Sequence, residues 1–201
     1  MKKILIVFFC IMLISVNIFA ETNDLSTGNG NGGKNKIGAW LGFPFMGLSY
    51  SHEFNDLMEL DLLVGVTGLF PLSQKLNFRT GLLFTVWEPV IKGQKCPLTI
   101  GPALDVHSNN GLIYRKEGYP RGFFSAGVQV LCPVRWEINF QRAPSFNLFI
   151  EAAPSVGFTY YFKDMDNTQN ALLQKWINNR MAIELIPHIG LGLRYRIPNK
   201  K

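Results

Sequence analysis

A histidine and a serine stand side by side in the segment His107-Ser108-Asn109-Asn110. A serine activated by a histidine base can cleave an ester, but the two side chains must lie within hydrogen-bond reach. Neighbouring residues on a β-strand point to opposite faces, so the adjacency of His107 and Ser108 separates their side chains. The segment is therefore interpreted as the polar end of a strand entering a loop, and no catalytic residue is predicted.

The other residues able to do chemistry are scattered. His52 and His188 are lone histidines in strand-like segments, where internal hydrogen bonding is the expected role. Glu137 and Glu151 accompany Arg135 as paired structural carboxylates. The sequence has no CxxC pair, no Cys/His cluster with metal-ligand spacing and no glycine-rich phosphate loop leading into a helix. We therefore expect neither a metal nor a cofactor.

The first twenty residues carry the pattern of a cleaved secretory signal. A basic start at Lys2 and Lys3 precedes an almost unbroken apolar run over 4–16, and Ala20 stands before a polar segment. The run is short for a membrane span, although an uncleaved N-terminal anchor is the alternative. We predict a signal peptide over 1–20 and a flexible leader over 21–35, so that the mature chain lies outside the cytoplasm of a bacterium.

Removal of residues 1–20 leaves 181 residues with 18 basic and 14 acidic side chains, a formal net charge of +4. The excess is spread along the chain and forms no basic patch, so no nucleic-acid partner is expected. Cys96 and Cys132 are the cysteines that remain. They could form one disulfide in an oxidising compartment, or they could be two free thiols.

Apolar and polar residues alternate from Lys36 onward, which is typical of strands whose two faces meet different surroundings. Tilted strands of about 9–11 residues can cross a bilayer. We predict eight strands, over about 37–44, 46–54, 57–67, 76–87, 97–107, 123–140, 146–162 and 183–197. A domain over 36–197 and a short tail over 198–201 follow.

Proline interrupts four of the predicted strands, at Pro102, Pro133, Pro154 and Pro187. Proline has no N–H for the strand ladder, so each position should need a bulge or a solvated backbone. The connections over 108–122 and 163–182 are long and polar. In the second, 167–180 could form a short helix with Leu172, Leu173, Trp176 and Ile177 on one face.

The polar face of the strands carries charges of both signs among small residues, and this set contains no lysine. Arginine is preferred where charge pairs are desolvated and geometrically fixed, so we predict a network inside a barrel with the apolar face outward. Aromatic residues near the strand ends fit interfacial girdles. The predicted interior network consists of Glu59, Asp61, Arg79, Asp105, Arg135, Glu137, Glu151, Glu184, His188 and Arg194.

The segments GFPFMGLSYSHEFND (42–56), KLNFRTGLLFTVW (75–87), FNLFIEAAPSVGF (146–158) and IPHIGLGLRYRI (186–197) resemble the small OmpA/OmpX-like outer-membrane β-barrels. The resemblance implies an all-β fold, an eight-stranded antiparallel transmembrane barrel, here with the short helix in its last long loop. It also implies a location in the cell outer membrane. The implied partners are outer-membrane lipid and the barrel-insertion machinery. It implies no single activity, since such barrels include anchors, adhesins and lipid-modifying enzymes.

These expectations favour a monomeric, non-enzymatic outer-membrane barrel of structural or surface-interaction type, whose long loops meet an unknown partner. An eight-stranded barrel is filled by side chains, so a general porin is not expected. The first alternative is a soluble periplasmic, lipocalin-like barrel that binds a small apolar ligand. The second is a lipid A hydrolase, because outer-membrane lipid A deacylases resemble this chain in size and fold. Those enzymes, however, place the histidine and serine two residues apart.

Overall fold

The computed structural model describes residues 33–67, 75–110, 124–140, 142–162 and 174–198. The predicted signal peptide, most of the predicted leader and most of the tail lie outside the described residues. No helix within these ranges is long and apolar enough to cross a membrane.

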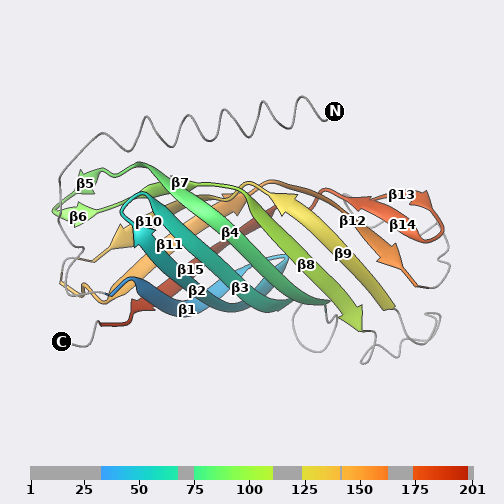
Figure 1. The fold of residues 1–201 in the computed structure, drawn as a ribbon, viewed down its shortest axis with the longest axis horizontal. Coiled ribbons are helices and arrows are strands. Elements are labelled where there is room, and N and C mark those ends of the chain that lie inside the picture. Colours follow the sequence, from blue (N-terminus) through green and yellow to red (C-terminus); the bar gives the residue numbers. More distant parts are fainter. Residues whose placement is uncertain (1–32, 68–74, 111–123, 141, 163–173, 199–201) are drawn as a thin grey trace.

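The described chain is all-β and forms a closed antiparallel barrel of eight strands (Figure 1). Pairing of the first strand with the last closes it. Four barrel strands are continuous, namely β1 (Asn35–Phe43), β2 (Phe45–Asn55), β3 (Met58–Thr67) and β4 (Lys75–Trp87). The other four each have two parts in line, β7 (Leu98–Ile100) with β8 (Ala103–Asn110), β9 (Phe124–Leu131) with β10 (Val134–Asn139), β11 (Phe146–Ala153) with β12 (Ser155–Tyr161), and β14 (Met181–Glu184) with β15 (His188–Arg196). The eight predicted strands are confirmed.

The two ends of the barrel differ. The end that we call the turn end holds the tight β2–β3 connection, the chain end after β15 and a small hairpin of β5 (Val90–Ile91) and β6 (Gln94–Lys95) (Figure 1). Lys92 and Gly93 form the turn of that hairpin, with φ angles of 52° and 77° that suit a tight two-residue turn. The opposite end, the loop end, is where the connections over 68–74, 111–123 and 163–173 leave the barrel.

The short helix predicted over 167–180 is wrong where the structure describes this segment. Residues 174–178 form β13 (Gln174–Asn178), which pairs with β14 in a hairpin at the loop end. The β1–β15 pairing ends at Phe43 and Ile189, so β1 does not reach the edge of β14. A strand forms over 174–178 because β13 pairs with this edge. The other part of the predicted helix, 167–173, lies outside the described residues.

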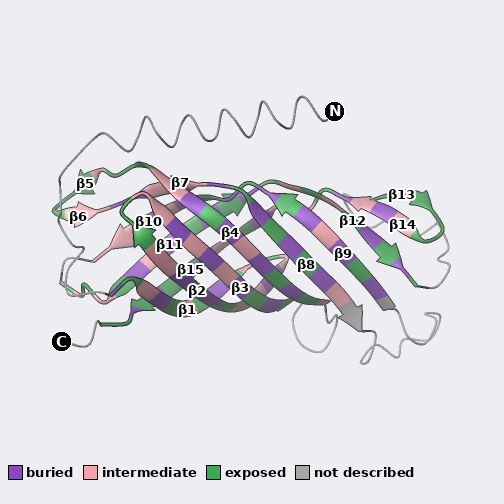
Figure 2. Cartoon of the chain, viewed as in Figure 1, coloured by how far each residue is buried: buried purple, intermediate pink, exposed green. Residues whose placement is uncertain are grey.

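Burial alternates along every long strand (Figure 2). The large apolar side chains of these strands are mostly on the exposed, outer face. Phe78, Val130 and Leu193 are 45%, 57% and 49% exposed, whereas Arg79 and Arg194 are buried inside. The predicted orientation of the two faces is confirmed. A small group of large apolar side chains is also enclosed, formed by Trp40, Phe45, Leu63 and Phe149.

The four prolines interrupt neighbouring strands at one level of the wall without any bulge. Pairing is in the same register on both sides of each interruption, as in Ile100 with Val134 and Ala103 with Leu131. Carbonyls of the prolines still accept bonds, from Leu82 N to Pro102 O, from Gly101 N to Pro133 O and from Cys132 N to Pro154 O. Of the two expected accommodations, a bulge or a solvated backbone, no bulge forms, and Pro102, Pro133 and Pro154 each lie in a pair that keeps one ladder bond through the proline carbonyl.

Replacing Pro154 by valine should therefore stabilise the barrel. A valine N–H could donate to the Cys132 carbonyl and complete a two-bond pair, which is worth about 0.5–1.5 kcal/mol. Urea unfolding of the refolded barrel measures the change. Ala152→Val is the matched control, since Ala152 is exposed on the outer face of the same barrel strand but already has a ladder donor. Equal gains for both variants would attribute the effect to apolar surface alone.

The possible Cys96–Cys132 disulfide is not formed. Trp136 pairs with Leu98, so the two cysteines lie roughly 20 Å apart along their strands at about 3.3 Å per residue. A disulfide requires Cα atoms within about 7 Å. Cys96 is a buried free thiol and Cys132 is a free thiol exposed on the outer face.

Candidate functional site

The centre of the barrel interior holds a balanced network of charges contributed by six of the eight barrel strands. Arg135 on β10 is the centre of it, with Nη2 at 2.8 Å from Asp61 and Nε at 2.9 Å from Glu151. Arg79 binds the same two carboxylates, at 3.2 Å and 2.7 Å. Four buried cations face four buried carboxylates here, Lys36, Arg79, Arg135 and Arg194 against Glu59, Asp61, Glu137 and Glu151.

The guanidinium groups are also stacked on the enclosed aromatic rings. Two of them lie against the Phe149 ring, with the guanidinium carbons of Arg135 and Arg194 at 4.3 Å and 4.5 Å from its centroid. Trp40 stacks on Phe149 at 5.7 Å, and Arg79 lies over Trp40. Arginine suits these positions because its planar, weakly hydrated group can stack and form forked bonds at the same time.

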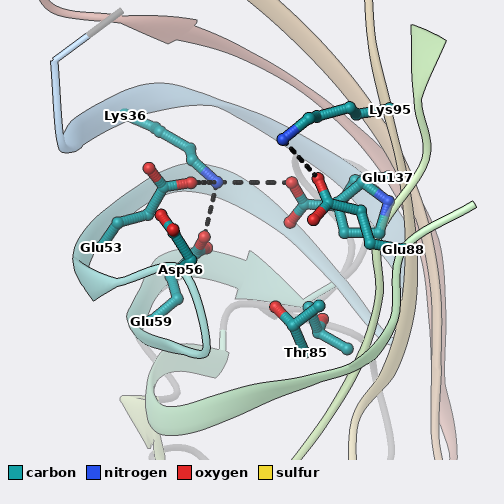
Figure 3. Close-up of a pocket in the computed structure, with 10 residues that line it drawn as sticks. Lys36, Glu53, Asp56, Glu59, Thr85, Glu88, Lys95 and Glu137 are labelled. Carbon is teal, nitrogen blue, oxygen red and sulfur yellow. Dashed lines mark hydrogen bonds and ion pairs between the residues drawn. The ribbon is translucent and has the colours of Figure 1, made fainter. Parts of the chain in front are cut away.

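A pocket of about 40 Å³ opens at the turn end (Figure 3). Lys36 reaches into it from β1, and its ammonium lies 2.8 Å from Glu53, 2.5 Å from Glu59 and 3.3 Å from Glu137. Lys36 is absent from the predicted polar-face set, which contains no lysine, so the interior includes a lysine that the prediction lacks. Lys36 is only 1% exposed, because three carboxylates compensate its desolvation.

A second polar cluster lies at the loop end. Both ring nitrogens of His107 have partners, with Nδ1 at 3.2 Å from Asp105 and Nε2 at 2.9 Å from the Thr159 hydroxyl. Glu184 lies 3.3 Å from the same Nε2, and Lys75 lies 3.2 Å from Glu184. These groups come from four barrel strands, β4, β8, β12 and β14, and β9 lies between β8 and β12.

The loop-end cluster separates His107 from Ser108, as the sequence predicts. His107 is buried, and Ser108, the next residue of β8, lies on the other face of that strand. Asp105, His107 and Thr159 do stand in the order carboxylate, imidazole, hydroxyl. Thr159 is fully buried, however, and Glu184 shares the nitrogen that would act as base. We interpret the arrangement as a structural network.

All ten residues predicted for the interior network are buried, but the structure divides them into two groups. Seven join the central network, namely Glu59, Asp61, Arg79, Arg135, Glu137, Glu151 and Arg194. Asp105, Glu184 and His188 belong to the loop-end cluster. Sequence reasoning missed Lys36, Trp40, Asn147 and Phe149. Extending the alternation of the first strand by one residue would have found Lys36 and Trp40, which share the inner face.

Gly192 makes room for the stacked rings. A Cβ at this position would lie 2.3 Å from Phe149 Cε1 and Cζ and 2.9 Å from the Ala39 carbonyl oxygen. Gly192→Ala should destabilise the barrel by about 1–3 kcal/mol, because the Phe149 ring is packed against Trp40 and two guanidinium groups and cannot move freely. Urea unfolding measures this. Phe149→Leu in the Gly192→Ala background should recover part of the loss, and a purely additive loss would contradict the proposed clash.

Within the described residues, no group of three or more His, Cys, Asp and Glu side chains could hold a metal ion. Comparison of the chain with protein families, with curated proteins and with solved structures finds no match.

Proposed function

We propose that this protein is an integral β-barrel of a bacterial outer membrane. It serves a structural or surface-interaction role through its long loops and is not a general pore. The observation that carries the proposal is the inversion of the barrel, with its charges enclosed and its apolar side chains outside.

The outer apolar surface is continuous across neighbouring strands. Leu41 pairs with Leu191, which pairs with Ile150, and all three side chains are about half exposed or more. Monomeric soluble proteins rarely expose a large contiguous apolar patch. A closed barrel also satisfies its backbone hydrogen bonds internally, which the hydrocarbon core requires.

Aromatic side chains support two interfaces. Tyr195 contacts Phe146 at 5.5 Å between ring centroids near the turn end, and Tyr160 contacts Phe162 at 5.7 Å towards the loop end. All four are exposed on the outside. Amphipathic aromatic rings favour the headgroup level at both faces of a membrane. Two girdles with an aliphatic band between them fit a spanning barrel.

The charged filling disfavours both a pore and the lipocalin-like alternative. Arg79, Arg135 and Arg194 occupy the barrel axis, are fully or almost fully buried and bind carboxylates on several strands. An apolar ligand would need an apolar cavity, whereas polar and charged residues make up most of the border of the turn-end pocket and of the pocket at the loop end. The lipid A hydrolase alternative loses its proposed His–Ser pair, because the two side chains lie on opposite faces.

Membrane extraction tests the proposal. After expression with its own N-terminal segment in a Gram-negative host, the protein should stay in the outer-membrane pellet through alkaline carbonate and be released by detergent. Full release by carbonate without detergent would exclude the integral barrel. Lipid A acyl analysis with wild type and His107→Ala tests the hydrolase alternative, and we expect identical acyl profiles.

A further inference from the structure

Within the described sheet, β13 pairs along only one of its two edges, with β14. It lies on the side of β14 that corresponds to β1, because β1 pairs with β15, the strand in line with β14. β1 ends at Phe43, and β13 follows it in the wall, nearer the loop end (Figure 1). No described strand lies beyond β13 in the position that corresponds to β2, and we call this side the free edge.

The direction of the backbone groups of β13 follows from the register. Tyr161 N donates to the Arg180 carbonyl at 2.7 Å, so this pair bonds β12 to the chain that leads into β14. Bonded and non-bonded pairs alternate along an antiparallel ladder, and each residue directs its N–H and C=O to the same side. Ile183, three residues after Arg180, therefore directs its groups to β13 and bonds with its register partner Lys175.

Two residues of β13 direct backbone groups to the free edge. Gln174 and Trp176 flank Lys175 in the strand, so their N–H and C=O groups point away from β14. A row of such groups is a template on which another strand can form, with main-chain hydrogen bonds that supply affinity. Because β13 has 5 residues, the added strand would be a short segment.

Lys175 gives the free edge a charge preference. It is exposed, and it lies on the outer face because its register partner Ile183 stands between two buried residues of β14. The backbone of Lys175 bonds to β14, so Lys175 would form a non-hydrogen-bonded pair with an added strand, and in such pairs the side chains are closest. A carboxylate opposite would complement the ammonium. Ile177, which is 57% exposed, adds an aliphatic surface further along β13.

We propose that the free edge of β13 binds an extended peptide segment of another protein, which adds to the sheet as an antiparallel strand. The segment carries an acidic side chain opposite Lys175 and an aliphatic side chain two residues before it, beside Ile177. This inference deepens the proposed surface-interaction role, on which it rests, by naming the kind of partner.

A second copy of this chain does not suit the free edge. Antiparallel pairing of two β13 strands would turn one barrel upside down relative to the other, whereas copies inserted by one route face the same way in a membrane. A lysine on a short edge strand also discourages indiscriminate pairing. The partner is therefore a segment whose charge is opposite to that of Lys175.

A synthetic peptide tests the edge. The full chain, refolded in dodecylphosphocholine micelles, is titrated with acetyl-SVTETVT-amide, in which both valines and the glutamate share one face. ¹⁵N–¹H NMR follows the backbone amides. Those of Gln174 and Trp176 should shift in a saturable way and should exchange more slowly with solvent, because they gain acceptors. Absence of saturable binding would overturn the proposal.

N-methylated peptides separate strand addition from apolar association. Methyl groups on the third and fifth residues of the peptide remove the N–H groups that would bond to β13, and binding should be lost. Methyl groups on the second and fourth residues point away from β13, and binding should be retained. Equal affinity of the two methylated peptides would show that main-chain pairing does not hold the segment.

A charge reversal tests the preference for an acidic segment. Lys175→Glu should weaken binding of acetyl-SVTETVT-amide by about fivefold or more and should strengthen binding of acetyl-SVTKTVT-amide. Lys92→Glu is the matched control, because Lys92 is an exposed lysine in the turn-end hairpin, and it should change neither affinity. Equal effects of the two variants would refute a role for Lys175.

The barrel without peptide tests the other occupants. Its Gln174 and Trp176 amides should exchange freely, and it should sediment as a monomer in micelles. Protection in a dimer would assign the edge to a second copy, and protection in a monomer would assign it to the chain itself. Either result would overturn the proposal. A barrel that carbonate extracts but that binds the peptide would lose its membrane location and keep this site, so the two proposals fail separately.

Discussion

Arg135→Met should destabilise the barrel by about 3–5 kcal/mol, which is enough to prevent refolding of a marginal barrel. Arg135 binds Asp61 at 2.8 Å and Glu151 at 2.7 Å, and no part of its side chain is exposed. The four-to-four balance of buried charges becomes three cations against four carboxylates. Methionine fills part of the volume, so most of the loss comes from the uncompensated charge rather than from a cavity. Urea unfolding of the refolded protein measures the loss.

Two further variants separate charge from packing. Arg142→Met removes an exposed arginine at the turn end and should change stability by less than about 0.5 kcal/mol. Arg135→Met with Glu151→Gln removes one charge of each sign and should recover a substantial part of the loss. If the double variant is as unstable as the sum of the two single variants, charge balance is not what Arg135 contributes.

Leu191→Arg should impair folding into a bilayer by about 2–4 kcal/mol if the residue lies near the midplane. Leu191 is 48% exposed on the outer face, between Leu41 and Ile150 on the neighbouring strands. In lipid, the guanidinium would lose its hydration without a counter-charge. In a soluble barrel the same side chain would point into water and cost almost nothing. Folding into phospholipid vesicles at a series of urea concentrations measures the difference.

The control for Leu191→Arg places an arginine at a different expected depth in the membrane. Tyr195→Arg lies four residues further along the same strand, in the aromatic pair near the turn end, and should cost only about 0–1 kcal/mol. Leu191→Val tests side-chain size alone and should be nearly neutral. Equal tolerance of arginine at 191 and 195 would contradict a membrane around this face.

The strands and their orientation could be predicted because alternation in a strand is a local property. In the segment 183–197, the polarity of each residue indicates which face of the strand it occupies. Eight segments of this kind were enough to predict an all-β barrel. The composition of the polar face also indicated the interior, since arginines and carboxylates with small residues between them suit an enclosed network. Lys36 was missed because the first strand was begun one residue late.

Contacts between distant segments could not be predicted. The helix expected over 167–180 has a helical pattern, but β13 pairs with the free edge of β14 instead, and tertiary pairing overrides the local preference. The prolines suggested bulges or solvated backbone positions. Whether prolines of neighbouring strands lie side by side depends on the pairing register of those strands, which cannot be read from the sequence. The same register separates Cys96 from Cys132.

The sequence by itself determined that the chain makes amphipathic strands, because side-chain alternation needs no knowledge of partners. Only the tertiary structure decided which charges meet. Arg135 and Glu151 are neighbours across one strand pair, but Arg194 and Glu59 join from opposite parts of the chain only when the barrel closes. Closure also brings Asp105 and His188 to the lining of one loop-end pocket, because neighbours in the folded barrel are set by geometry in space and not by distance along the chain.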